Sequence, residues 1–149
     1  MITLTNRQEY DYFVERGFQP LILNPFVRLE HGLRVEIQRE LFGHSILSKG
    51  NILKGNQRFY EWCWKHILTD GEHICQNCAA ELFEYSADFI SHVISRSNEP
   101  IMAHDPRNVN IFCRVCHGLW EDYRNRKKMN IYVFNSRLMI TLKREYRIK

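Results

Sequence analysis

The pattern of apolar and polar positions predicts helices near both ends and in the middle of the chain. Residues 6–16 (NRQEYDYFVER) look like a short helix that ends at Gly17, and residues 57–68 (QRFYEWCWKHIL) place their apolar side chains at helical spacing. We interpret the second segment as a core helix rather than an aromatic cofactor site. Residues 131–146 carry an apolar helical face, which consists of Ile131, Phe134, Leu138, Leu142 and Tyr146.

The segments between the first two of these helices are less regular. Residues 20–28 (PLILNPFVR) are expected to be extended, because Pro20 and Pro25 interrupt any helix. Residues 31–42 have mixed periodicity, which favours neither a helix nor a strand. Residues 48–56 (SKGNILKGN) contain two glycines and predict a loop.

Two short strands and a helix are expected in the second half of the chain. Residues 89–95 (FISHVIS) are rich in strand-forming side chains, and residues 109–112 (VNIF) predict a second short strand. Because alternate side chains of a strand face opposite sides, His92 points away from its two neighbours. A helix is expected to begin at His117 and to continue through residues 118–128. Helices packed around a small β-containing centre place the chain in the α+β class.

Four of the five cysteines form two Cys-x-x-Cys pairs, Cys75–Cys78 and Cys113–Cys116. Each pair turns two thiolates toward a common point, so we favour a structural zinc site over a redox role. Cys63, the remaining cysteine, is expected to be a buried small hydrophobe. The beginning of the chain lacks the features of a signal peptide, and no apolar run is long enough to span a membrane. We therefore expect a cytoplasmic, reducing location.

Charge is distributed unevenly along the 149 residues, whose net charge is +4. Residues 71–117 carry three Lys or Arg against six Asp or Glu, whereas residues 118–149 carry nine against three. An acidic patch beside a basic segment suits a metal-dependent enzyme that acts on a polyanion. A solvated basic helix explains the charge alone equally well.

A histidine, an asparagine and a second histidine accompany the cysteine pairs. Fifteen residues separate His92 from Asn108, and eight separate Asn108 from His117, which directly follows the second pair. Glu121 stands four residues beyond His117, so the two lie on one helical face and are candidates to bind one cation. The alternatives are a satisfied strand histidine at His92 and a turn residue at Asn108. His117 is otherwise a helix-start residue or a further zinc ligand, and Glu121 a solvated carboxylate.

Residues 75–121 resemble the HNH, or ββα-metal, endonucleases, in the version whose finger is clamped by two Cys-x-x-Cys pairs. The segments CQNC, SHVISRS and DPRNVNIFCRVCH carry the resemblance, which covers about a third of the chain. The flanking segments resemble small HNH proteins of phages and prophages more loosely. The resemblance implies an N-terminal helical and extended region over residues 1–70, an HNH finger over 71–128 and a basic helix over 129–149.

The family resemblance implies a metal-dependent DNA endonuclease that hydrolyses phosphodiester bonds. His92 would act as the general base, and Asn108 would orient its imidazole. His117 and Glu121 would bind a catalytic Mg²⁺ or Mn²⁺, and the four cysteines would hold a separate structural Zn²⁺. DNA is then the expected partner, in the cytoplasm of a bacterial host if the chain is phage-encoded, and no membrane is involved. A homodimer or a phage protein partner is left open.

Ser91 departs from the family pattern, because the residue before the base is commonly an Asp or His that binds the metal ion. A serine hydroxyl is a weak ligand, so Ser91 is the weakest member of the expected metal site. Asp105 or His104 from the neighbouring loop are candidates to compensate. The alternative function is therefore a zinc-stapled nucleic-acid-binding module without catalytic activity.

Overall fold

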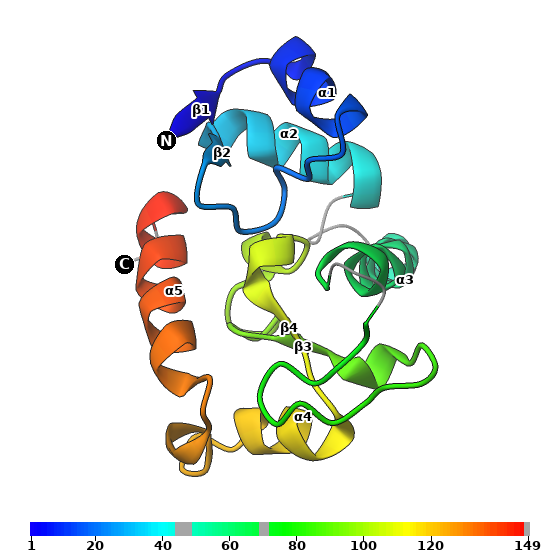
Figure 1. Ribbon diagram of the computed structural model, residues 1–149, viewed down its shortest axis with the longest axis vertical. Coiled ribbons are helices and arrows are strands. Elements are labelled where there is room, and N and C mark those ends of the chain that lie inside the picture. The colour runs from blue at the N-terminus through cyan, green and yellow to red at the C-terminus, as the bar shows by residue number, and fades with distance from the viewer. Residues whose placement is uncertain (44–48, 69–71, 148–149) are drawn as a thin grey trace.

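The computed structural model describes residues 1–43, 49–68 and 72–147, and within these ranges it combines five α-helices with two two-stranded sheets (Figure 1). Helices and small sheets together with a cluster of four cysteines make a mixed α+β structure, in agreement with the predicted fold class. Within the described residues, no helix is both long enough and apolar enough to cross a membrane.

The N-terminal part consists of β1 (Ile2–Leu4), α1 (Arg7–Glu15), β2 (Val27–Leu29) and α2 (His31–Phe42). β1 and β2 pair in parallel, and Figure 1 shows them with α1 and α2 at one end of the molecule. The Asn6 side chain accepts the backbone N–H of Glu9 and so caps α1, and Gly17 follows the helix with a φ of 86°. The helix predicted over residues 6–16 is confirmed. Only the end of the segment expected to be extended, residues 20–28, belongs to a strand.

α3 (Lys49–His66) is longer than the sequence pattern predicts. The core helix expected over residues 57–68 is confirmed up to His66. The loop expected over residues 48–56 is wrong from Lys49 onward, and residue 48 lies outside the described residues. Packing therefore overrides the weak helix preference of the glycines and asparagines in this segment.

Gly55 shows why a glycine stands inside α3. A Cβ atom at this position would lie 2.3 Å from the carbonyl oxygen of Phe42 and 2.8 Å from the ring of His104. Side chains do not approach backbone oxygen atoms that closely. The glycine thus permits a close contact between α3 and the end of α2, and it does not mark a turn.

The centre of the molecule consists of two antiparallel strands and a helix, β3 (Ile90–His92), β4 (Val109–Ile111) and α4 (Arg114–Glu121). Both strands lie within the segments predicted for them. The helix expected through residues 118–128 is wrong beyond Glu121. There the chain becomes extended at Asp122, whose carboxylate accepts backbone N–H groups of the following turn.

α5 (Tyr132–Glu145) confirms the helix predicted over residues 131–146, but its buried face differs from the prediction. Phe134 is 55% exposed, whereas Asn135 is completely buried. The side-chain amides of Asn135 and Asn110 exchange two hydrogen bonds of 2.8 and 3.4 Å. This pairing with β4 satisfies the buried amide and rotates the helix so that Phe134 faces outward.

The buried apolar side chains form three clusters. The first lies within the N-terminal part, the second joins α3 to β3 and β4, and the third joins the cysteine pairs to α4 and α5. Cys63 is completely buried in the second cluster, as predicted. The strands therefore lie between α3 on one side and α5 on the other (Figure 1).

Candidate functional site

The four cysteines of the two Cys-x-x-Cys pairs come together at one point. Their sulfur atoms all lie within 4.8 Å of one another, and those of Cys78 and Cys113 are 3.7 Å apart. Thiolates bound to a tetrahedral zinc ion at ~2.3 Å stand ~3.8 Å from one another. The donor set therefore fits a structural metal ion such as zinc.

Backbone contacts fix the first cysteine pair against β4. Gln76 donates its N–H to the carbonyl oxygen of Ile111 at 2.8 Å, and its side-chain oxygen accepts the N–H of Ile111 at 2.8 Å. Burial raises the pKa of the Cys75 thiol, but hydrogen bonds from backbone groups of both pairs outweigh it and lower the pKa to about 7. A thiol that ionises near neutral pH is prepared to bind a metal ion.

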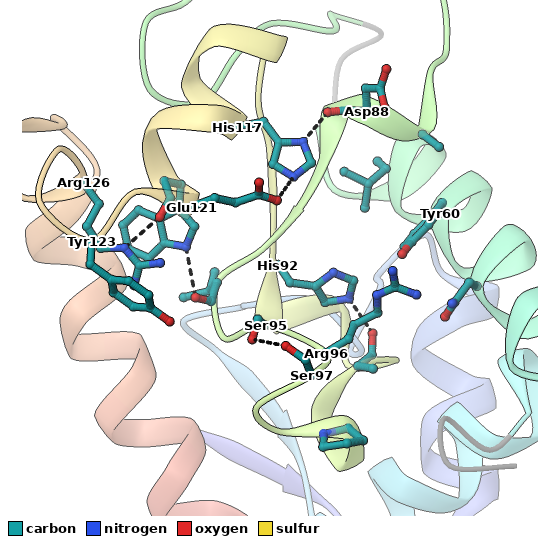
Figure 2. Close-up of a pocket in the computed structure, with 17 residues that line it drawn as sticks. Tyr60, Asp88, His92, Ser95, Arg96, Ser97, His117, Glu121, Tyr123 and Arg126 are labelled. Carbon is teal, nitrogen blue, oxygen red and sulfur yellow. Dashed lines mark hydrogen bonds and ion pairs between the residues drawn. The ribbon is translucent and has the colours of Figure 1, made fainter. Parts of the chain in front are cut away.

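A cavity of about 930 Å³ lies between α3, β3, the loop after β3 and α4 (Figure 2). His92, His117 and Glu121 all line it. The other polar side chains of its lining are Asn56, Tyr60, Asp88, Ser95, Arg96, Ser97, Tyr123 and Arg126. The structure thus brings the two predicted histidines and the glutamate into one space.

His92 is held with one ring nitrogen free. Its Nε2 lies 2.8 Å from the carbonyl oxygen of Ala103, which is only an acceptor, so Nε2 carries the proton and Nδ1 keeps its lone pair. Burial lowers the pKa of His92 to about 4, although the hydrogen bond to Ala103 acts in the opposite direction. The imidazole is therefore neutral at pH 7 and able to accept a proton at Nδ1.

An NMR titration of the His92 ring is expected to have its midpoint near pH 4 instead of the usual 6.5. The unfolded chain binds this proton near pH 6.5, so between about pH 6.5 and 4 the unfolded state holds more protons than the folded state. Stability conferred by the neutral ring is present above pH 6.5 and falls as the pH is lowered through this window. A midpoint close to 6.5 would contradict a buried neutral imidazole.

Asn108 supports the loop around His92 rather than the ring itself. The side chain is completely buried, and its Oδ1 accepts the N–H of Ile94 at 2.8 Å. Its Nδ2 donates to the carbonyl oxygens of Ile94 and Met102 at 3.0 and 3.3 Å. These bonds join the segment after β3 to the residue before Ala103. Any effect of Asn108 on the imidazole is transmitted through this backbone.

His117 and Glu121 face each other across one turn of α4. The Nδ1 of His117 donates to the carbonyl oxygen of Asp88 at 2.5 Å, and its Nε2 lies 3.1 Å from Oε1 of Glu121. Either a proton on Nε2, which makes an ion pair with the carboxylate, or a metal ion between the two atoms satisfies this contact. Adjacent ligands of an octahedral Mg²⁺ stand about 3 Å apart, so the pair fits such an ion. His117 is the fourth residue of α4 and not its first, as was expected.

Ser91 is not brought into the cavity. Its side chain is 1% exposed, it pairs with Asn110 in the strand register, and its Oγ has no hydrogen-bond partner within the described part of the chain. The alternation of the strand places it on the face opposite to His92. The structure therefore gives no support to Ser91 as a metal ligand.

The two residues expected to compensate for Ser91 also lie outside the cavity lining. The ring nitrogens of His104 contact Oδ1 of Asn56 at 2.7 Å and the carbonyl oxygen of Gly43 at 3.2 Å. Asp105 is completely buried among cationic side chains. Neither residue is placed to bind an ion beside His117.

Asp105 is the centre of a buried ionic network that connects α2 and the end of α5 to the loop around His92. Its oxygens lie 3.4 Å from Arg34, 2.7 Å from Arg107 and 2.9 Å from the hydroxyl of Tyr146. Burial raises the pKa of Asp105, but Arg107 and Arg34 outweigh it and hold the pKa far below its usual range. The network thus anchors the loop to α2 and to the end of α5 at Asp105, two residues after Ala103, whose carbonyl oxygen contacts His92.

Three contributors to the cavity were not identified from the sequence. Asp88 and Ala103 act through their carbonyl oxygens, which leave no signal in the side-chain types. Arg96 lines the cavity four residues after His92. Its position as a cation in the same short segment as the candidate base is the signal by which the sequence could have identified it.

Comparisons of the chain with models of protein families, with curated proteins and with solved structures find no match. A proposal about the function therefore rests on the geometry of the site. That geometry comprises a cluster of four thiols and, beside it, a cavity lined by two histidines and a glutamate.

Proposed function

We propose that the protein is a metal-dependent DNA endonuclease of the HNH type. The observation that carries the proposal is that His92, with a free Nδ1, and the pair of His117 and Glu121 line one cavity. β3, which pairs with β4, carries His92, and α4, which begins at the four-thiol cluster, carries His117 and Glu121. A general base activates the attacking water and a metal ion stabilises the charge that develops on the phosphate, so the two together suit hydrolysis of a phosphodiester.

In the proposed reaction, His92 takes a proton at Nδ1 from a water molecule whose oxygen attacks phosphorus. As the new P–O bond forms, the bond from phosphorus to the 3′ oxygen breaks. That oxygen is protonated from solvent, and the imidazolium returns its proton to solvent, so one water is consumed. His117 and Glu121 would hold a divalent ion, which would supply positive charge to neutralise the phosphate and stabilise the leaving oxygen. The products are a 5′-phosphate and a 3′-hydroxyl.

The four cysteines act as the scaffold of this site by holding Zn²⁺. Cys113 caps α4, and Cys116 lies in its first turn directly before His117. Cys75 and Cys78 lie in the turn that contacts β4 through Gln76. Zinc bound between them joins β4 to α4 and thereby fixes His117 relative to the strands.

DNA is the proposed substrate because basic residues follow the site. Arg124, Lys127 and Lys128 are exposed directly after α4, and residues 118–149 carry nine Lys or Arg against three Asp or Glu. Such a segment attracts the phosphate backbone without regard to base sequence. It supports binding of the phosphates that flank the scissile bond.

A zinc-stapled nucleic-acid-binding module without catalysis is the second candidate. The burial of Ser91 favours it, because of the three side chains expected to hold the catalytic ion, His117 and Glu121 then remain. Both candidates bind nucleic acid and contain the zinc cluster. Cleavage separates them.

Nicking of supercoiled plasmid is expected to require an added divalent cation, and to require a higher concentration of it when His117 is replaced. The zinc-loaded protein should convert the plasmid to the open-circular form in Mg²⁺ or Mn²⁺ and leave it intact when neither is added. His117→Ala removes one of two ligands, so the cation concentration at half-maximal rate should rise at least about tenfold.

His31→Ala is the matched control, because His31 contacts Glu145 and Tyr146 outside the cavity. Its cation dependence should equal that of the wild type. Plasmid that is bound but intact in every cation would favour the binding module. Cleavage with an unchanged cation dependence in His117→Ala would contradict the metal assignment.

A further inference from the structure

Arg96 is a cation of the cavity lining that has no acidic partner. Within the described part of the chain, none of the ion pairs involves its guanidinium. Its closest ring contact is Tyr60, whose centroid lies 6.0 Å from the guanidinium carbon. We propose that Arg96 binds a non-bridging oxygen of the scissile phosphate, an inference that rests on the proposed nuclease function.

The position of Arg96 relative to His92 supports this role. Figure 2 shows the guanidinium beside the His92 ring and between that ring and Tyr60. The positive charge also contributes, after burial, to the low pKa of His92. A phosphate that accepts hydrogen bonds from Arg96 therefore lies beside the nitrogen that activates the attacking water.

The cavity has two sides of opposite charge. The Glu121 carboxylate lies with His117 on one side, where Asp88 contributes its carbonyl oxygen, whereas Arg96 lies on the side of α3 and His92 (Figure 2). A phosphodiester between the two sides has one oxygen toward the cation held by the acidic side and another toward Arg96. The planar guanidinium donates two parallel N–H groups, which matches phosphate geometry.

Arg126, the other arginine of the lining, is already committed to contacts within the protein. Its guanidinium carbon lies 4.1 Å from the Trp120 ring centroid and 4.3 Å from that of Tyr123. Its Nε donates to the carbonyl oxygen of Trp120 at 2.8 Å. Arg96 has no comparable hydrogen bond among the described residues, so its donors are free for a ligand.

The test compares Arg96→Gln and Arg96→Lys with Arg28→Gln, which removes the same charge from an exposed side chain that donates to the hydroxyl of Thr3 outside the cavity. Affinity for a DNA duplex is measured against salt concentration with no divalent cation added, so that cleavage does not interfere. Loss of one phosphate contact should reduce the slope of log affinity against log salt by about 0.9 in Arg96→Gln and leave it unchanged in Arg28→Gln. Arg96→Lys should keep most of the slope.

Single-turnover cleavage in Mn²⁺ is the second readout. Arg96→Gln should cleave at least about 100-fold more slowly, as expected when a donor to the transition state is lost, and Arg96→Lys should recover part of the rate. If the wild type does not cleave DNA but Arg96→Gln still reduces the salt slope, the phosphate site at Arg96 is retained and the nuclease function is refuted. If the wild type cleaves DNA and Arg96→Gln has the same salt slope and the same cleavage rate, the assignment of Arg96 is overturned. Equal losses in both glutamine variants would overturn it as well, because net charge would explain them.

Discussion

Replacing Cys113 with serine is expected to abolish zinc binding and to unfold the region around α4. Cys113 has two functions, since its sulfur belongs to the four-thiol cluster and also accepts the backbone N–H of Cys116 as the cap of α4. Zinc binding in small domains supplies on the order of 10 kcal/mol, and that free energy is folding free energy. A domain's whole stability is about 5–15 kcal/mol, so the loss should be decisive.

Metal analysis and thermal melting followed by circular dichroism test this expectation. Cys63→Ala is the matched control, because Cys63 is equally a buried cysteine but lies outside the cluster. The control should retain one zinc ion per chain and lose stability only through its small cavity. If Cys113→Ser kept its metal and melted like the wild type, the zinc scaffold would be refuted.

Replacing His92 with alanine is expected to slow DNA cleavage about 10²–10⁴-fold while DNA affinity remains unchanged. The ring supplies the unprotonated Nδ1, and within the cavity lining His117 is the only other histidine; its Nδ1 donates to Asp88 and its Nε2 faces Glu121. The loss should therefore appear in the single-turnover rate constant and not in the dissociation constant. Measurement of both quantities separates a base from a residue that only contacts DNA.

Imidazole added to the solution sharpens this test. The cavity of about 930 Å³ has room for a free imidazole in place of the deleted ring. Added imidazole should restore part of the rate of His92→Ala and leave that of His31→Ala unchanged. A His92→Ala rate equal to that of the wild type would exclude His92 as the base.

Local sequence patterns predicted the elements whose signals are local. The helix that ends before Gly17, the core helix that ends at His66 and the two short strands all lie where apolar spacing, caps and strand propensity placed them. The cysteine cluster was also predictable, because two short turns with fixed spacing determine where four thiols point. The three-part division of the chain at residues 70 and 128 stays a prediction.

Features that depend on distant partners could not be read from local patterns. Gly55 and its neighbours suggested a loop, yet contact with Phe42 requires a glycine inside a helix. Asn135 interrupts the apolar face of α5 because it pairs with Asn110, and this partner lies 25 residues away in the sequence. Asp105 looked like a polar loop residue, but its partner Arg34 lies 71 residues earlier.

The candidate site divides in the same way. The spacing of His117 and Glu121 on one helix predicted that they face each other, and they do. The alternation of a strand predicted that Ser91 and His92 face opposite sides, and only His92 lines the cavity. The carbonyl groups that set the two histidine tautomers are positioned by the packing of loops, so the residue types in the sequence did not predict these hydrogen bonds. The roles of these side chains in catalysis stay predictions.

The most direct test of the proposed function is the cleavage of supercoiled plasmid by zinc-loaded protein, followed by treatment of the product with DNA ligase. The account predicts open-circular DNA only when Mg²⁺ or Mn²⁺ is added, and ligase should reseal it because the nick carries a 5′-phosphate and a 3′-hydroxyl. An identically purified His92→Ala protein should leave the plasmid supercoiled over the same time. Intact plasmid with the wild type, or equal nicking by His92→Ala, would contradict an active site in this cavity.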